Sequence, residues 1–211
     1  MASVGLLYVG AVLFVNALLL LDRVDGKAAA ILNLFVGALQ VVLPTLLILQ
    51  AGGDIKAISA AAGIYLFGFT YLYVGIGLLA GIDTSGVGWF SLFVSISAIV
   101  FALINFFRLN DHPFGVIWLM WSFLWLLFFV TLGLKREEFT RYTGWVTLVQ
   151  AWVTAVVPAF LILTGLYEPS AAWAVGLAAF AVVVFALLWV VAGPARTRSH
   201  STAPPRSPAG R

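Results

Sequence analysis

The chain has 211 residues, of which 63% are hydrophobic and 9% are charged, and its formal net charge is +3. A soluble domain carries about a quarter charged residues, so this composition excludes a soluble globular protein and indicates a polytopic membrane protein. The basic residues lie in short connections and a C-terminal tail, so they give no sign of nucleic-acid binding. The absence of cysteine excludes disulfides, thiol catalysis and thiolate metal sites.

Seven apolar segments are each long enough to cross the hydrocarbon core of a bilayer, which is about 30 Å thick. They lie at about 3–21, 28–50, 57–80, 87–107, 114–134, 143–165 and 171–192. The first segment has no basic residue before it and no small-residue cleavage pattern after it, so we expect a retained span. The predicted fold is an all-α bundle of seven transmembrane helices.

Lysine and arginine are distributed unevenly over the alternate connections. If the N-terminus faces outward, nine of them lie on the inner side and only Lys56 and Arg108 lie on the outer side. The positive-inside rule therefore predicts an outer N-terminus and a cytoplasmic C-terminus. Residues 194–211 are rich in Pro, Ser and Arg and are predicted to form a disordered basic tail that is attracted to anionic membrane lipid.

The seven segments contain no Asp, Glu, Lys, Arg or His. Ion-driven transporters, retinal proteins and intramembrane hydrolases generally need a buried ionisable group, so each of these classes becomes less favoured. No catalytic residue, metal ligand or cofactor is expected.

The fifth segment carries a stripe of aromatic rings. Spacings of three and four residues place Trp118, Trp121 and Trp125 on one helical face, with Phe114 one turn earlier. At about 1.5 Å per residue, Trp125 lies near the middle of the bilayer. The rings either fill space between helices, which the stripe alone favours, or form a narrow slot for flat, uncharged solutes.

Neutral polar residues of several segments fall at one depth. Asn16, Tyr71 and Gln150 lie roughly 20 Å from the predicted outer edge, with Asn33 close to this level. Hydrogen bonds between helices explain any one of them and contribute about 1 kcal/mol each. Their convergence on one level favours a polar lining of a constriction.

Six motifs along the chain resemble those of the AmiS/UreI family of urea and short-chain amide channels, most closely its amide-transporter branch. They are LLYVGAVLFVN (6–16), LNLFVGAL (32–39), LFGFTYLY (66–73), GWFSLFV (88–94), IWLMWSFLW (117–125) and FTRYTGW (139–145). The resemblance implies a homohexamer in the bacterial inner membrane, with one pore in each protomer. It also implies a six-helix channel core at 1–165, which leaves 166–193 as an additional C-terminal transmembrane helix.

The resemblance further implies which side chains line the pore. By their match to the family motifs, the pore-lining residues are Leu6, Val9, Leu13, Asn16, Phe67, Tyr71, Trp118, Trp121, Leu124 and Trp125. Two further lining positions depart from the acid-activated urea channel, because Phe114 replaces a tryptophan and Gln150 replaces a glutamate. The short connection at 51–56 has no histidine, and His112 alone is a poor basis for a switch near pH 6.

These observations together predict a passive channel, not acid-gated, for urea and short-chain aliphatic amides such as acetamide. We expect it to supply a cytoplasmic amidase or urease, and to act on small neutral solutes without cofactor, metal or nucleic acid. Two alternatives remain open: an ion-coupled secondary transporter of small amides, and a seven-helix membrane sensor or enzyme.

Overall fold

The computed structural model describes residues 2–194, and all regular structure within this range is helical. The α-helices are α1 (Ala2–Leu20), α2 (Gly26–Gln50), α3 (Ile55–Ala62), α4 (Ile64–Ala80), α5 (Ser85–Ile104), α6 (His112–Phe128), α7 (Thr140–Gln150), α8 (Val157–Leu163) and α9 (Ala171–Ala192). Three π-helices, η1 (Asn105–Leu109), η2 (Phe129–Gly133) and η4 (Ala151–Val156), and one 3₁₀ helix, η3 (Glu137–Phe139), extend or link them.

Consecutive elements join into seven helices that are long and apolar enough to span a membrane. They cover 2–20, 26–50, 55–80, 85–109, 112–133, 137–163 and 171–192. The predicted all-α bundle of seven spans is thus confirmed, and the sixth span begins earlier than predicted, at Glu137. From residue 195 onward, the predicted basic tail lies outside the described residues.

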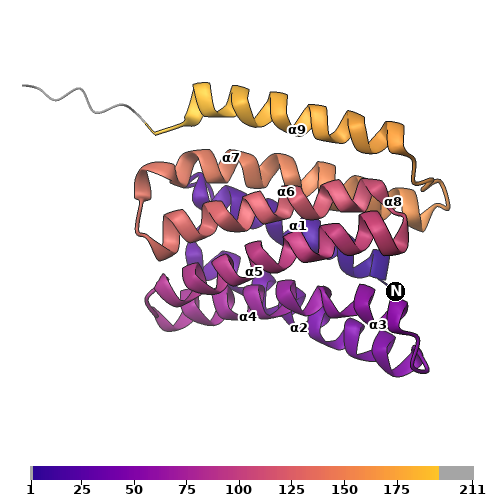
Figure 1. The fold of residues 1–211 in the computed structure, drawn as a ribbon. Helices are drawn as coiled ribbons and strands as arrows, with labels where there is room; N and C mark the ends of the chain where they lie inside the picture. The colour runs from indigo at the N-terminus through magenta and orange to yellow at the C-terminus, as the bar shows by residue number, and fades with distance from the viewer. Residues whose placement is uncertain (1, 195–211) are drawn as a thin grey trace, which may run out of the picture.

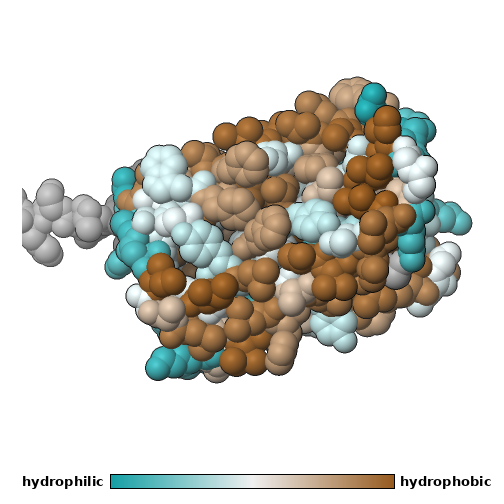
Figure 2. All heavy atoms as spheres, turned by 90° about the horizontal axis from the view of Figure 1, so that it is seen from below, coloured by the Kyte–Doolittle hydropathy of each residue, from teal (hydrophilic) through white to brown (hydrophobic). Residues whose placement is uncertain are grey.

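The outer surface of the bundle is suited to lipid. Figure 2 shows hydrophobic residues across the middle of one side of the molecule and hydrophilic residues gathered at both ends. Large apolar side chains such as Phe35, Phe93 and Val190 are exposed, which water disfavours and hydrocarbon accommodates. The molecule is therefore a multi-pass membrane protein.

The long helices run side by side between two ends of the molecule (Figure 1). We call the end that holds Ala2 and the connections 51–54 and 164–170 the N-terminal face. The opposite end, which holds the connections 81–84 and 134–136, is the C-terminal face. These names carry no assumption about which end faces the cytoplasm.

The fifth and seventh spans occupy very different places in the bundle. In the fifth span, which contains α6, 61% of the most apolar stretch is buried, compared with 17% in α9. α9 lies along α6 and α7 at the edge of the bundle (Figure 1). Phe185 of α9 stacks on Phe123 with ring centroids 5.3 Å apart, and Trp189 meets Tyr142 at 5.1 Å. The aromatic fifth span is therefore the centre of the bundle.

The sixth span changes helix type halfway along its length. The π-helix η4 precedes Pro158, which has no N–H to donate to the preceding turn. Gly10 of α1 lies so close to this segment that an added Cβ would collide with the side chain of Val156. The irregular backbone of the sixth span is thus packed directly against α1.

Candidate solute pathway

Two cavities enter the bundle, one from each face. The N-terminal cavity has a volume of about 260 Å³ and the C-terminal cavity about 350 Å³. α1, α4, α5 and α6 contribute side chains to both cavities, and no residue lines both. The same four helices therefore run past a cavity at each face.

On α1, α4 and α6, successive turns pass from one cavity to the other. The N-terminal cavity is lined by Leu6, Val9, Phe67, Phe114, Trp118 and Trp121, and the C-terminal cavity by Leu13, Asn16, Thr70, Tyr71, Trp125 and Phe128, among others. Ten of the twelve residues predicted to line a pore are in these two sets. The conduction role of these residues stays a prediction.

A cluster of aromatic rings centred on Phe67 separates the two cavities. The Phe67 ring lies 4.8 Å from Trp121 and 4.9 Å from Trp125, in both cases edge to face. Phe67, Trp121 and Trp125 are 4%, 3% and 0% exposed. Because Trp121 lines one cavity and Trp125 the other, the barrier is about one layer of rings thick. We call Phe67, Trp121 and Trp125 the aromatic barrier.

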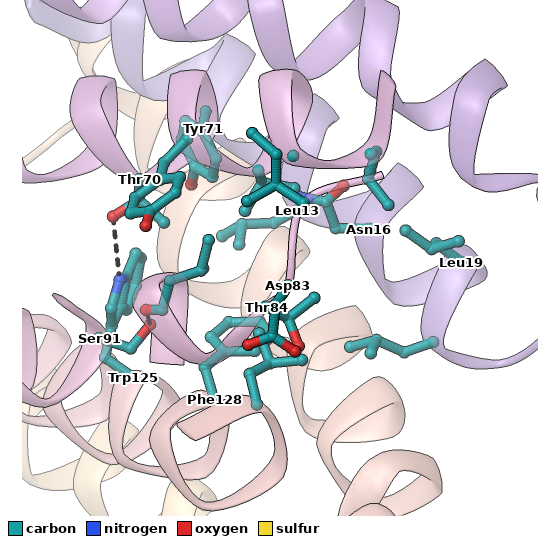
Figure 3. Close-up of a pocket in the computed structure, with 18 of the residues that line it drawn as sticks. Leu13, Asn16, Leu19, Thr70, Tyr71, Asp83, Thr84, Ser91, Trp125 and Phe128 are labelled. Carbon is teal, nitrogen blue, oxygen red and sulfur yellow. Dashed lines mark hydrogen bonds between the residues drawn. The ribbon is translucent and has the colours of Figure 1, made fainter. Parts of the chain in front are cut away.

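Both indole N–H groups of the barrier donate hydrogen bonds to threonine hydroxyls. Trp125 Nε1 donates to Thr70 Oγ1 at 3.3 Å (dashed in Figure 3), and Trp121 Nε1 donates to Thr154 Oγ1 at 2.9 Å. The two hydroxyls in turn donate to the backbone carbonyls of Leu66 and Gln150. A satisfied indole N–H no longer offers hydrogen bonds to a solute, so the two indoles offer it mainly ring carbons.

The C-terminal cavity is lined by Tyr71, whose buried hydroxyl is unpaired among the described residues. Tyr71 is 1% exposed, and its hydroxyl has no hydrogen-bond partner among the described residues. Asn16, by contrast, exchanges two hydrogen bonds with Asn33, at 2.9 and 2.6 Å. Figure 3 shows Asn16, Tyr71 and Trp125 around this cavity. Tyr71 thus brings a hydroxyl without a protein partner to the wall of this cavity.

The mouth of the C-terminal cavity carries an ion pair. Lys135 Nζ donates to Asp83 Oδ2 at 2.8 Å and to Thr84 Oγ1 at 3.0 Å, and Asp83 and Thr84 line the cavity. The hydrogen bond from Lys135, followed by those from Ser85, holds the pKa of Asp83 well below its ordinary value. The carboxylate therefore stays ionised and paired in mildly acidic solution.

Leu124 and Gln150 line neither cavity. Gln150 is fully buried, its Nε2 donates to the Met120 carbonyl at 2.9 Å, and its Oε1 has no partner among the described residues. The structure thus places Gln150 behind the wall of the cavities, where it links the sixth span to α6. The polar level predicted from depth contains Asn16 and Tyr71 at a cavity surface, without Gln150.

Sequence reasoning missed the two threonines that orient the barrier and also Phe101. Phe101 stacks on Trp118 with ring centroids 4.7 Å apart and an interplanar angle of 23°. Thr70 lies within the LFGFTYLY motif and Thr154 lies four residues after Gln150. Neither position carries a signal for its indole partner, because that partner belongs to another span.

Comparison with known proteins places the chain in a family. The family model described as AmiS/UreI family transporter matches residues 1–166. A Rhodococcus erythropolis relative whose name is transporter protein AmiS2 is 55% identical over 194 residues, which are 92% of this chain and 94% of the relative. A Mycolicibacterium smegmatis relative named as an amidate substrates transporter protein is 49% identical over 88% of each chain.

Solved structures agree with this assignment. The urea channel of Helicobacter pylori in a closed state aligns with a TM-score of 0.72 and 33% identity, covering 80% of this chain and all of that chain. The sequence of the acid-activated urea channel of H. pylori is 34% identical over 77% of this chain and 97% of the channel.

The fold and the paired cavities define a multi-pass α-helical membrane protein with a solute-sized cavity at each face. The chain belongs to the AmiS/UreI family, and it is a transport protein, not an enzyme.

Proposed function

We propose that this protein is a passive channel for urea and short-chain aliphatic amides such as acetamide. The observation that carries the proposal is the pair of cavities, lined by the same four helices and separated by one layer of rings. The names of the relatives, which refer to amidate substrates and to urea, supply the solute class.

The aromatic barrier favours planar neutral solutes over ions. Taking an amide out of water costs about 2–7 kcal/mol if its hydrogen bonds are not replaced, whereas an isolated ion costs on the order of 20 kcal/mol. The flat ring faces of Trp121 and Trp125 match a planar amide, and the free Tyr71 hydroxyl replaces one of its lost hydrogen bonds. Neither contribution compensates a charge, so ions are rejected at the rings.

A passive mechanism is favoured over coupling to an ion gradient. Coupling requires a group within the membrane that binds the driving ion, and such groups are usually Asp, Glu, Lys, Arg or His. The side chains of the aromatic barrier and of the Asn16–Asn33 pair are all uncharged. The neutral, sparsely polar lining beside the aromatic barrier also binds solutes weakly enough to let them leave.

The further parts of the proposal concern setting and regulation. The protein lies in the bacterial inner membrane with its N-terminal face outside, so that the N-terminal cavity is the outer entrance and Asp83 lies at the inner mouth. It assembles as a homohexamer and feeds a cytoplasmic amidase or urease. Acid does not gate it, because the Asp83–Lys135 pair persists in mild acid and His112 is the one histidine among residues 2–194.

Stopped-flow swelling of proteoliposomes with urea, acetamide and glycerol tests the transport activity. We expect urea and acetamide to enter faster than in protein-free vesicles, with glycerol slower because it is neither planar nor an amide. Radiolabelled acetamide should reach the same concentration inside and outside, with or without a proton or sodium gradient. Accumulation that collapses on adding an ionophore would establish the coupled transporter instead.

A further inference from the structure

The N-terminal cavity contains one ionisable side chain among those that line it, the carboxylate of Asp111. Its Oδ1 accepts a hydrogen bond from the backbone N–H of Phe114 at 3.1 Å and from the hydroxyl of Tyr167 at 2.6 Å. No hydrogen bond from the described residues reaches Oδ2. The carboxylate is therefore held in a fixed orientation with one oxygen available.

The hydrogen bond from Tyr167 persists over a wide pH range. Partial burial, followed by the hydrogen bond to Asp111 and the charge of that carboxylate, raises the pKa of Tyr167 well above its ordinary value. The phenol therefore remains protonated and continues to donate. Tyr167 thus acts as a permanent positioning residue for Asp111.

No ion pair neutralises this carboxylate among the described residues. Their two ion pairs join Lys135 to Asp83 and Arg136 to Glu138, so neither Arg108 nor His112 forms one with Asp111. A carboxylate that faces a partly enclosed apolar cavity without a counter-ion attracts a cation.

Two amide side chains that line the cavity also offer acceptors to a ligand that donates hydrogen bonds. Asn105 Nδ2 donates to the Phe101 carbonyl at 2.8 Å, and Gln40 Nε2 donates to the Gly5 carbonyl at 2.6 Å. Each of these nitrogens uses one of its two N–H groups in this way, and the carbonyl oxygens of both side chains accept no hydrogen bond from the described residues, so they remain as acceptors in residues that line the cavity. With Asp111 Oδ2, the cavity presents acceptors of three different residues.

Aromatic rings complete the site. Phe114 lines the cavity and packs edge to face on Tyr167, with ring centroids 5.6 Å apart. Trp118 also lines it, stacked on Phe101. Ring faces attract a flat cation and exclude water from around it, which strengthens its pairing with a carboxylate.

We propose that the N-terminal cavity binds small planar monocations of the amidinium and guanidinium class, with Asp111 as their counter-ion. Acetamidinium and guanidinium have nearly the shapes of acetamide and urea, but they carry a positive charge and donate hydrogen bonds only. They fit wherever the neutral solutes fit and stop at the aromatic barrier, which has no charge to compensate theirs. A bound cation therefore blocks the pathway, and this blocking role rests on the proposed channel function.

Saturation-transfer difference NMR with the protein in nanodiscs tests the binding directly, without reference to transport. The probe is the methyl resonance of acetamidinium, with acetamide as the uncharged comparison. We expect saturation transfer to acetamidinium in the wild-type protein. Asp111→Asn removes a charge-assisted hydrogen bond, so the dissociation constant of acetamidinium should rise about tenfold.

Asp54→Asn is the matched control, because Asp54 is an exposed carboxylate on the same face that also caps a helix, and asparagine caps as well as aspartate. It should leave acetamidinium binding unchanged. Binding that survives Asp111→Asn, or that Asp54→Asn weakens equally, would overturn the proposed site.

The blocking role is tested in proteoliposomes, with acetamidinium added to the side of the N-terminal face and acetamide flux measured. We expect acetamidinium to inhibit acetamide flux in the wild-type protein. In Asp111→Asn, inhibition of that variant's own flux by half should need about tenfold more acetamidinium. If no acetamide flux exists, the channel function fails while the NMR result still decides the site. If acetamide flux is present and acetamidinium binds without inhibiting it, the blocking role is refuted.

Discussion

The two cavities share lining side chains from the same four helices, yet their polar groups differ in kind. At the N-terminal face, Asp111 has no ion-pair partner among the described residues, and the amides of Asn105 and Gln40 present acceptors. At the C-terminal face, Asp83 is paired with Lys135, and a tyrosine hydroxyl is free.

This difference separates two tasks that a selective channel must perform. Charge at a mouth changes which solutes enter it, whereas the neutral rings between the cavities decide which solutes cross. If this division is correct, substitutions in the barrier should change selectivity, and substitutions at a mouth should change access or pH response only.

Removing a ring of the barrier should produce the largest effect. Trp125→Ala deletes the fully buried indole between Phe67 and the C-terminal cavity, so we expect the acetamide-to-glycerol permeability ratio to fall by about tenfold or more. Stopped-flow swelling measures this ratio.

Trp125→Ala also removes buried volume at a cost of about 3–5 kcal/mol, so its folding must be checked. Trp125→Phe keeps a ring, and we expect it to retain most of the selectivity. Trp152→Ala serves as the control, because Trp152 is 51% exposed and lines neither cavity. An unchanged ratio in a folded Trp125→Ala protein would mean that the rings are not the filter.

Gln150→Glu tests whether Gln150 belongs to the wall of the pathway or lies behind it. An ionised carboxylate there cannot donate to the Met120 carbonyl and would be buried without a partner. We expect a loss of about 3–5 kcal/mol in stability, seen as a lower thermal midpoint, with little change in solute selectivity.

Gln50→Glu adds the same charge at an exposed position and should leave stability nearly unchanged. A selectivity change in Gln150→Glu with normal stability would instead support the lining role predicted from the family resemblance.

Tyr71→Phe removes only the free hydroxyl beside the barrier. The hydroxyl has no partner among the described residues, so its loss should not destabilise the protein. If it hydrogen-bonds a passing amide, acetamide flux should fall about fivefold, which corresponds to about 1 kcal/mol. Tyr8→Phe, at an exposed position on α1, is the matched control. Equal fluxes in both variants would remove Tyr71 from the mechanism.

The smallest effect is expected from pH. The pKa of Asp83 is lower in the folded protein than in the unfolded chain, so its pairing with Lys135 is lost only when the pH falls through that lowered value. The pair is also exposed and contributes little energy. Acetamide flux should therefore change by less than about twofold between pH 7 and pH 5. A steep rise in flux over this interval would show acid gating.

Sequence reasoning predicted the elements of this protein that depend on composition and spacing. Hydrophobic length located the seven spans, and spacings of three and four residues placed Trp118, Trp121 and Trp125 on one face. The three π-helices were not predictable, because such breaks depend on the packing of neighbouring spans, as between Gly10 and Val156.

The depth of a side chain in the membrane could be predicted from the sequence, but the direction in which it points could not. Counting 1.5 Å per residue gives the level of a side chain in the membrane but not the side of the helix from which it points. Asn16 and Tyr71 point to a cavity, and Gln150 is turned to the Met120 carbonyl. The orientation of the indole rings depends on Thr70 and Thr154, two hydroxyls on other spans, which no local pattern reveals.

The most direct test of the neutral barrier compares two solutes of the same shape and different charge. Entry of acetamide and of acetamidinium should be measured in the same wild-type proteoliposomes, against protein-free vesicles. We predict that acetamide equilibrates across the membrane and that acetamidinium does not enter. Comparable entry of both solutes, or accumulation of acetamide above its external concentration, would contradict a passive pathway with an uncharged barrier.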